Sequence, residues 1–278
     1  MTPASQRSRS RLRLALALLG LALAAYGVGA YLVLPTAWRH FERQKGLEGL
    51  PMLTRTAQGI PADPMNLSLV GSKEEVICAM RSAAWYPADP ITFRSSIGIV
   101  GSVLFRRPYP HAPVSTLFYR DRPEDLAFER PDGKTASRRN HVRFWQVLDQ
   151  GEEGRAVWLG AATFDRKVGF NHYTGQVTHH IAPDIDAERD YLVDTLKAAK
   201  VVEAIYEVSG IGPTINGRNG EGDPYYSDGE IKVLRLARGC GNTVDNAVVL
   251  DNPHAIDLKN AVWDKALKAL LSWRASRE

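Results

Sequence analysis

The chain has 278 residues, and its hydrophobic, aromatic and charged fractions are ordinary for a globular protein, which excludes a largely disordered chain. Its net charge of +4 includes four arginines at positions 7, 9, 11 and 13, and the remainder is close to neutral. The basic balance therefore gives no reason to expect nucleic acid as a partner.

An uncharged, apolar run of 21 residues extends from Leu14 to Leu34, behind a basic region at residues 1–13. As a helix it would be ~31 Å long, which matches a hydrocarbon core of about 30 Å. A cleaved signal peptide is the alternative, but its apolar region is usually only about 7–15 residues long. We therefore expect a retained transmembrane anchor at residues 14–34.

The arginines before this span outnumber the basic residues shortly after it, Arg39, Arg43 and Lys45, by only one. The orientation of the span is inferred from this small difference in positive charge. We expect the N-terminus inside and the main domain outside, which in a bacterium means an inner-membrane protein with its domain in the periplasm. Cys78 and Cys240 fit that oxidising compartment as a disulfide, although two unrelated thiols fit the sequence equally well.

A connector with four prolines, residues 35–64, precedes a strand at 66–71. Ser72 and Glu75 then form a capping box, which predicts the start of a helix that ends before Trp85. Most of the next hundred residues have the alternation and the Gly/Pro breaks of β-structure. The expected strands are 98–105, 114–119, 126–129, 141–148, 155–165 and 176–181.

A second helix is predicted to start near Asp184 or Asp186, followed by paired strands at 201–209 and 230–237 around a Gly-rich loop. The last helix is expected from Asn252 to about Ser276, packed on the domain or on the connector. Its predicted apolar stripe is Leu258, Val262, Ala266, Leu267, Leu270 and Leu271.

Only two helices interrupt the strands, so the sequence predicts an α+β fold with a mainly antiparallel sheet and two packed helices. The anchor and an amphipathic C-terminal helix are added at its ends. The predicted domain limits are 1–13, 14–34, 35–64, 65–240 and 241–278.

The stretch from Arg138 to Trp145 is the first candidate site. In a strand, Arg139, His141 and Arg143 would point to one face, opposite Val142 and Phe144. The flanking cations would keep the imidazole neutral, as a base or a metal ligand. We expect this face to bind an anion; a surface strand with alternating charges is the alternative.

His179 and His180 are further catalytic candidates, and one of them could join His141 and Asp165. Adjacent residues of a strand face opposite ways, so both cannot bind one ion. No HExxH, paired CxxC or EF-hand spacing is present, and we predict no metal site and identify no cofactor. Arg189 is a third cation, on the helix face that points at the sheet, where either a carboxylate or a bound anion would balance it.

Acidic residues near the start of the second helix, at 184, 186 and 188, are expected to cap it and complement its dipole. The oxygen-rich loop 216–230 is expected to be a long hairpin connection at the rim of a site. The sequence contains no GxSxG elbow, P-loop or complete GxGxxG, the local signatures of several familiar enzyme classes.

Five segments of the chain form an ordered set: Gly59–Asn66 (GIPADPMN), Trp85–Pro90 (WYPADP), Arg139–Trp145 (RNHVRFW), Thr178–Ile181 (THHI) and Asp186–Arg189 (DAER). Together, over roughly residues 52–237, they resemble the LssY-like C-terminal domain. The resemblance implies a bacterial, membrane-associated protein of a family with no settled activity. Its members are often attached to integral membrane proteins of the phosphatidic-acid-phosphatase and DedA types, but the Pro-Ser-Gly-His stretch of the phosphatase part is missing here.

Three functions are compatible with these patterns. The favoured one is an accessory domain outside the membrane that binds an anionic group of a phospholipid or an envelope precursor, without catalysis. The second is a phosphoester hydrolase that uses His141 with His179 or His180. The third is a structural partner in a membrane complex. Convergence of His141, Asp165 and one further histidine in a pocket would favour the hydrolase, whereas pairing of both strand arginines with carboxylates would argue against the anion site.

Overall fold

We describe a computed structural model of the chain. The structure describes residues 3–28, 52–57, 59–88, 115–133, 137–151, 153–173, 175, 177–209, 216–252 and 254–275. The predicted strand at 98–105, residues 29–34 of the predicted anchor and most of the connector lie outside these ranges.

The chain divides into two compact units, residues 1–43 and 44–278. The first contains α1 (Pro3–Val28), on which the large apolar side chains from Leu14 to Val28 are exposed. Among the described residues, no helix is both long enough and apolar enough to cross a membrane.

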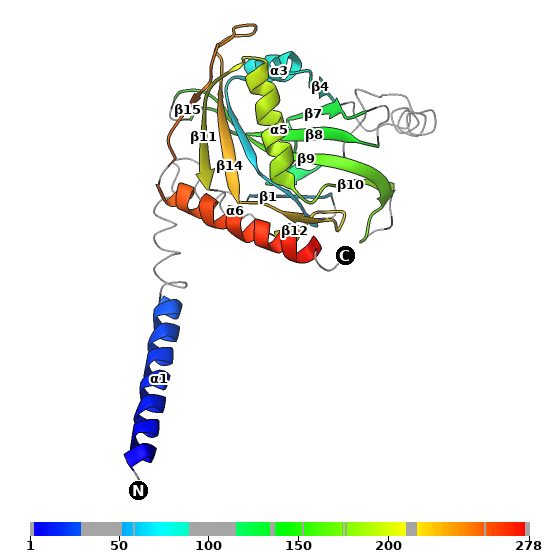
Figure 1. Ribbon diagram of the computed structural model, residues 1–278. Helices are drawn as coiled ribbons and strands as arrows, with labels where there is room; N and C mark the ends of the chain where they lie inside the picture. Colours follow the sequence, from blue (N-terminus) through cyan, green and yellow to red (C-terminus); the bar gives the residue numbers. More distant parts are fainter. Residues whose placement is uncertain are drawn as a thin grey trace. The chain divides into compact units, whose positions relative to one another are not determined.

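The second unit is an α+β domain built on a mainly antiparallel sheet, as predicted (Figure 1). Among the described residues, the sheet has nine strands in the order β15-β11-β14-β3-β9-β8-β7-β4, with β10 also paired to β9. Their bounds are β3 Leu67–Val70, β4 Tyr86–Pro87, β7 Leu126–Pro131, β8 Arg139–Leu148, β9 Val157–Phe170, β10 Val177–Ile181, β11 Val202–Ser209, β14 Glu230–Leu236 and β15 Val248–Val249.

Two smaller sheets complete the strands of the described residues. One has the order β2-β1-β5-β6, and the other is the hairpin β12-β13, which lies within the Gly-rich loop predicted before β14. Their bounds are β1 Leu53–Arg55, β2 Pro61–Pro64, β5 Phe118–Tyr119, β6 Arg122–Pro123, β12 Asn216–Arg218 and β13 Pro224–Tyr226.

Helices α3 (Lys73–Ser82) and α5 (Ile185–Ala198) cover one face of the large sheet (Figure 1). The predicted capping box is present at α3, where the Ser72 side chain accepts from the Glu75 backbone and the Glu75 carboxylate accepts from Ser72. The helices and the sheet share a buried core that includes Met80, Phe144 and Leu192.

The opposite face of the sheet is covered as well. A second buried cluster joins Met52 and Met65, near β1 and β2, to Trp145 on β8 and Leu159 on β9. Because both faces are packed, polar side chains on the second face lie beneath another layer. This layer positions the candidate site.

Cys78 on α3 and Cys240 after β14 form a disulfide, with their Cα atoms 5.5 Å apart. The sequence left this pairing open. The bridge joins segments separated by 162 residues and fixes α3 to the turn that follows β14.

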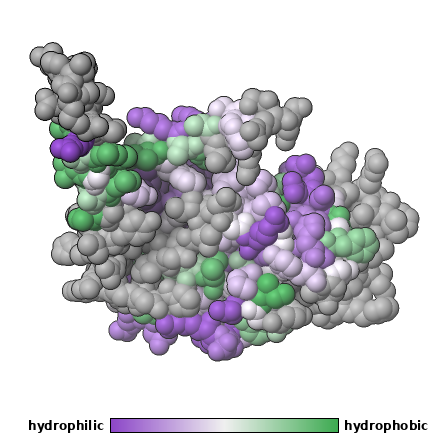
Figure 2. All heavy atoms as spheres, turned by 90° about the horizontal axis from the view of Figure 1, so that it is seen from below, coloured by the Kyte–Doolittle hydropathy of each residue, from purple (hydrophilic) through white to green (hydrophobic). Residues whose placement is uncertain are grey.

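The C-terminal helix α6 (His254–Ala275) lies against β11, but it presents a different face from the one predicted. Leu258 and Val262 are exposed, whereas Ile256 is buried. Lys259 pairs with the buried Glu230, and such a polar anchor is invisible to an apolar-stripe argument. Figure 2 views the side on which α6 lies and shows hydrophobic residues interspersed with hydrophilic ones.

Candidate functional site

Strand β8 carries the predicted alternation of side chains. Val142 and Phe144 pack in the core beneath α3 and α5, whereas Arg139, His141 and Arg143 point to the other face. The sequence did not predict their burial: each of the three is at most 4% exposed, because the second layer covers them. The alternative of a solvent-exposed charged strand therefore does not describe β8.

Arg139 is held between two buried carboxylates. Its Nη1 lies 2.8 Å from Oε2 of Glu129, and its Nε donates to Oδ2 of Asp165 at 2.9 Å. Burial lowers the pKa of Arg139, but the two carboxylates outweigh it and the pKa is raised overall. The charge of this arginine is thus balanced within the protein.

Arg143 is held more loosely. Its Nε donates to the backbone oxygen of Ser115 at 2.9 Å, and its Nη1 lies 3.4 Å from Oδ2 of Asp63. Burial raises the pKa of Asp63 above its usual value, although Arg143 and His141 oppose the shift. The pair is long for a charge-assisted hydrogen bond, which is typically about 2.7–2.9 Å.

His141 is held by a hydrogen bond at one ring nitrogen and lies near a buried carboxylate at the other. Its Nε2 lies 2.8 Å from Oγ1 of Thr163, its cross-strand neighbour on β9, and its Nδ1 lies 3.4 Å from Oδ2 of Asp165. The nearby carboxylate favours a proton on Nδ1, with the Thr163 hydroxyl donating to Nε2. Because the ring is buried and Nε2 is engaged by Thr163, we assign His141 as a positioning residue.

His179 brings a second imidazole to the same carboxylate. Its Nδ1 lies 3.9 Å from Oδ2 of Asp165, and its side chain is 15% exposed. Burial raises the pKa of Asp165, yet His141, His179 and Arg139 together hold this pKa well below its usual value. Asp165 therefore stays ionised, with an imidazole nitrogen of each histidine within 4 Å of its carboxylate.

These groups line a small polar pocket of about 30 Å³ that is partly open to solvent. Glu221, from the turn between β12 and β13, closes one side, which fits the predicted rim role of this loop. Burial, reinforced by the charge of Asp63, raises the pKa of Glu221 to about 8. The remaining lining residues are Asp63, Ser115, Arg139, His141, Arg143, Asp165, Thr178, His179 and Ile181.

His180 belongs to a different cluster, because it faces the other side of β10. Its Nδ1 lies 2.8 Å from Oδ1 of Asp223, and His172 Nε2 lies 3.7 Å from the same oxygen. Of the two neighbouring histidines predicted from the sequence, only His179 reaches the pocket. Within the described residues, His172, His180 and Asp223 are also the set whose donor atoms lie close enough together to hold a metal ion.

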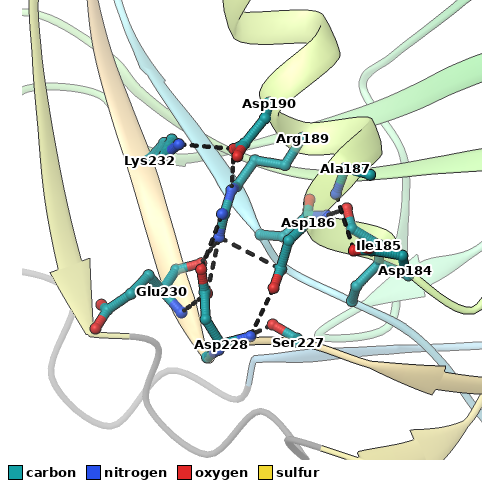
Figure 3. Close-up of polar contacts among 12 residues, drawn as sticks. Asp184, Ile185, Asp186, Ala187, Arg189, Asp190, Ser227, Asp228, Glu230 and Lys232 are labelled. Atoms are coloured by element: carbon teal, nitrogen blue, oxygen red, sulfur yellow. Dashed lines mark hydrogen bonds and ion pairs between the residues drawn. The ribbon is translucent and has the colours of Figure 1, made fainter. Parts of the chain in front are cut away.

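Arg189 is surrounded by carboxylates (Figure 3). It donates from Nη1 and Nη2 to the two carboxylate oxygens of Asp228 at 2.9 Å each, and from Nε to Asp190 at 2.8 Å. Its Nη1 also lies 3.4 Å from Asp186 and donates to the backbone oxygen of Glu230. This is the buried ion-pair arrangement given as the alternative to a bound anion, so we assign no anion to Arg189.

Sequence reasoning did not select Asp63, Thr163 or Glu221. Asp63 lies within the GIPADPMN segment, and Thr163 could have been found by pairing it with His141 across two predicted strands. Glu221 is one acidic residue among several in a long loop, and nothing in its sequence context distinguishes it from Asp223 or Asp228.

The model of one protein family, described as LssY C-terminus, matches residues 47–231. Searches of curated proteins and of solved structures give no match. The matched range includes β8, β9, β10 and α5, and hence the residues that line the pocket. Since it covers most of the chain, the protein belongs to the LssY C-terminus family.

Proposed function

We propose that the pocket is a hydrolytic active site that acts on a phosphoester. The observation that carries this proposal is the meeting of His141 and His179 at one buried carboxylate, Asp165, inside a polar pocket. A carboxylate behind an imidazole fixes its tautomer and stabilises its protonated form, which is the arrangement general base catalysis needs.

His179 is the proton-transferring imidazole of this proposal. It is the more exposed of the two rings beside Asp165, and a water molecule in the pocket can reach it. Glu221 supplies the second proton-transfer group, because with a pKa of about 8 it retains its proton at neutral pH. Two groups with opposite proton roles in one pocket are typical of acid–base catalysis.

The proposed substrate carries a phosphate because Arg143 is the cation of the pocket that is held least tightly. Its Nη1 lies 3.4 Å from Asp63, and a phosphate oxygen could compete for this guanidinium. Attachment of family members to phosphatidic-acid-phosphatase-type membrane proteins supports the same substrate class by association alone.

We further propose that the domain works at a membrane, on the periplasmic side. The uncharged run at residues 14–34 has the length of a span, and the part of it in α1 exposes its large apolar side chains. The disulfide between Cys78 and Cys240 supports an oxidising compartment.

A second candidate is an accessory module that binds the same phosphate-bearing group without turnover. The long Arg143–Asp63 contact favours this accessory module. The tight pairing of Arg139 with Glu129 and Asp165 argues against it, because the charge of one of the two proposed anion-binding arginines is already neutralised. In this reading the chain would assist a membrane-protein partner that performs the reaction.

Phosphate release and ligand binding by the full-length chain in detergent separate these candidates. The probes are p-nitrophenyl phosphate, phosphatidic acid and a polyprenyl phosphate. We expect phosphate release that falls at least 100-fold in His179→Gln, in line with the loss of a general base. It should be unchanged in His254→Gln, a control at an exposed histidine of α6. Saturable binding without phosphate release would favour the accessory module. If the chain neither binds nor hydrolyses any of the three probes, both candidate functions are ruled out.

A further inference from the structure

We propose that His172, His180 and Asp223 form a binding site for a transition-metal dication, with Zn²⁺ as its expected occupant. The three residues come from different segments: the turn between β9 and β10, strand β10, and the end of the β12–β13 turn. One donor atom from each lies within 4.8 Å of the others.

The distances between the donor atoms match those around a tetrahedral ion. Metal–ligand bonds of roughly 2.0–2.1 Å to histidine nitrogen and carboxylate oxygen place neighbouring donors roughly 3.3 Å apart. Here Oδ1 of Asp223 lies 2.8 Å from Nδ1 of His180 and 3.7 Å from Nε2 of His172. These two contacts bracket the required separation, and the two histidine nitrogens lie within 4.8 Å of each other.

The carboxylate is held in place by its second oxygen. Oδ2 of Asp223 accepts from the backbone nitrogen of Ile181 at 3.1 Å, and the backbone nitrogen of Asp223 donates to the Asn219 side chain at 2.8 Å. Oδ1 is thereby directed at the two imidazoles. Ligands oriented by such outer contacts are typical of metal sites.

The backbone makes room for the buried imidazole. A Cβ atom at Gly169 would lie 2.5 Å from Nε2 of His180, and one at Gly222 would lie 2.8 Å from Cβ of His172. Each ligand histidine thus lies directly against a glycine. At Gly222 the backbone φ is +86°, a conformation that glycine adopts readily.

The donor set selects the class of metal. Two imidazole nitrogens and one carboxylate oxygen suit Zn²⁺ and related ions, whereas Ca²⁺ takes six to eight oxygen ligands. His180 and Asp223 are buried, but the His172 side chain is 60% exposed. The exposed histidine leaves an approach for the ion and a fourth position for water.

A bound ion would join the turn after β9 to the β12–β13 hairpin. Glu221, which lines the polar pocket, lies two residues before Asp223. Its backbone oxygen accepts a hydrogen bond from the backbone nitrogen of His172 at 3.0 Å. The metal would therefore hold the hairpin that closes the pocket. This site stands on its own contacts, and its test requires no assumption about hydrolysis.

The test is a titration of the chelator-stripped, full-length chain with Zn²⁺, with no polyhistidine tag, followed by the visible absorption of bound Co²⁺. We expect one equivalent of Zn²⁺ per chain, a tetrahedral Co²⁺ spectrum, and no comparable binding of Ca²⁺. His172→Gln should weaken Zn²⁺ binding at least tenfold without unfolding the protein, because this side chain is exposed. Asp223→Asn keeps an acceptor for Ile181 and should weaken binding similarly.

The matched control is His254→Gln, which removes another exposed histidine and should leave Zn²⁺ affinity unchanged. The proposal is overturned if the wild-type chain takes up no stoichiometric Zn²⁺, or if His172→Gln binds it as tightly as the wild type. Loss of phosphate release with intact Zn²⁺ uptake, or the reverse, separates this inference from the proposed hydrolase.

Discussion

His179 and His180 are adjacent in β10, yet their imidazoles contact different carboxylates. Nδ1 of His179 lies 3.9 Å from Asp165, whereas Nδ1 of His180 lies 2.8 Å from Asp223. The alternation of a strand therefore distributes one dipeptide between two polar clusters. The β12–β13 turn does the same, since it supplies Glu221 to the pocket and Asp223 to the second cluster.

The pH dependence of the proposed hydrolysis should have an alkaline limb near pH 8. Glu221 donates a proton only while protonated, and its pKa is raised to about 8 by burial and by the charge of Asp63. In Asp63→Asn that charge is absent, so the limb should move to lower pH. Rates of phosphate release measured from pH 5 to 10 check this, and an unmoved limb in Asp63→Asn would assign the alkaline group elsewhere.

Replacement of Arg189 should destabilise the fold strongly. Arg189→Met removes the cation that faces Asp186, Asp190 and Asp228 (Figure 3), and the loss of one partner of a buried ion pair typically costs about 3–5 kcal/mol. Urea unfolding of the full-length variant measures the change.

Arg189→Lys provides the matched control, because it keeps the charge but cannot bind both oxygens of Asp228 at once. The free energy of unfolding of Arg189→Lys should lie between that of the wild type and that of Arg189→Met. A change below about 1 kcal/mol in Arg189→Met would show that the cluster is not a structural ion pair.

Much of the fold could be predicted because its signals are local. The capping box at Ser72, the alternation along β8 and the Asp184 cap of α5 each depend on a few neighbouring residues, and each is present in the structure. The antiparallel α+β class followed from these elements. These local features were thus predicted correctly.

The site depends on contacts that local patterns do not contain. Burial of Arg139, His141 and Arg143 follows from a second layer of short strands, and the partner Asp63 is 80 residues from Arg143 in the chain. For the same reason, the arginines of the predicted anion-binding face are found in ion pairs with carboxylates of the protein. The predicted apolar face of α6 was wrong at Leu258, which is exposed, whereas the adjacent Lys259 pairs with the buried Glu230.

Glu188 should make the stability of the domain depend on pH. It was expected to complement the dipole of α5, but it is 4% exposed, and burial, reinforced by Asp165, raises its pKa from 4.5 to about 9. Between these values the folded state keeps a proton that the unfolded state loses. Stability is therefore full below about pH 4.5 and declines as the pH rises towards 9.

Glu188→Gln removes this dependence, since an amide does not titrate. The variant should be more stable than the wild type at pH 8 by up to a few kcal/mol, given about 1.4 kcal/mol per pKa unit, and should differ little at pH 4.5. Denaturation midpoints at both pH values measure the difference. An equal change at the two values would mean that the effect comes from packing rather than from ionisation.

The disulfide should be a major source of stability, because it closes a long stretch of chain. Cys78 and Cys240 are 162 residues apart, and cross-linking so long a segment restricts the unfolded chain strongly. Cys240→Ser, or reduction of the wild type, should each lower the free energy of unfolding by about 2–5 kcal/mol. Urea unfolding midpoints with and without a reductant measure this loss of stability. The reductant should have no further effect on Cys240→Ser, and a wild-type midpoint that does not respond to reduction would mean that the bridge does not stabilise the folded domain.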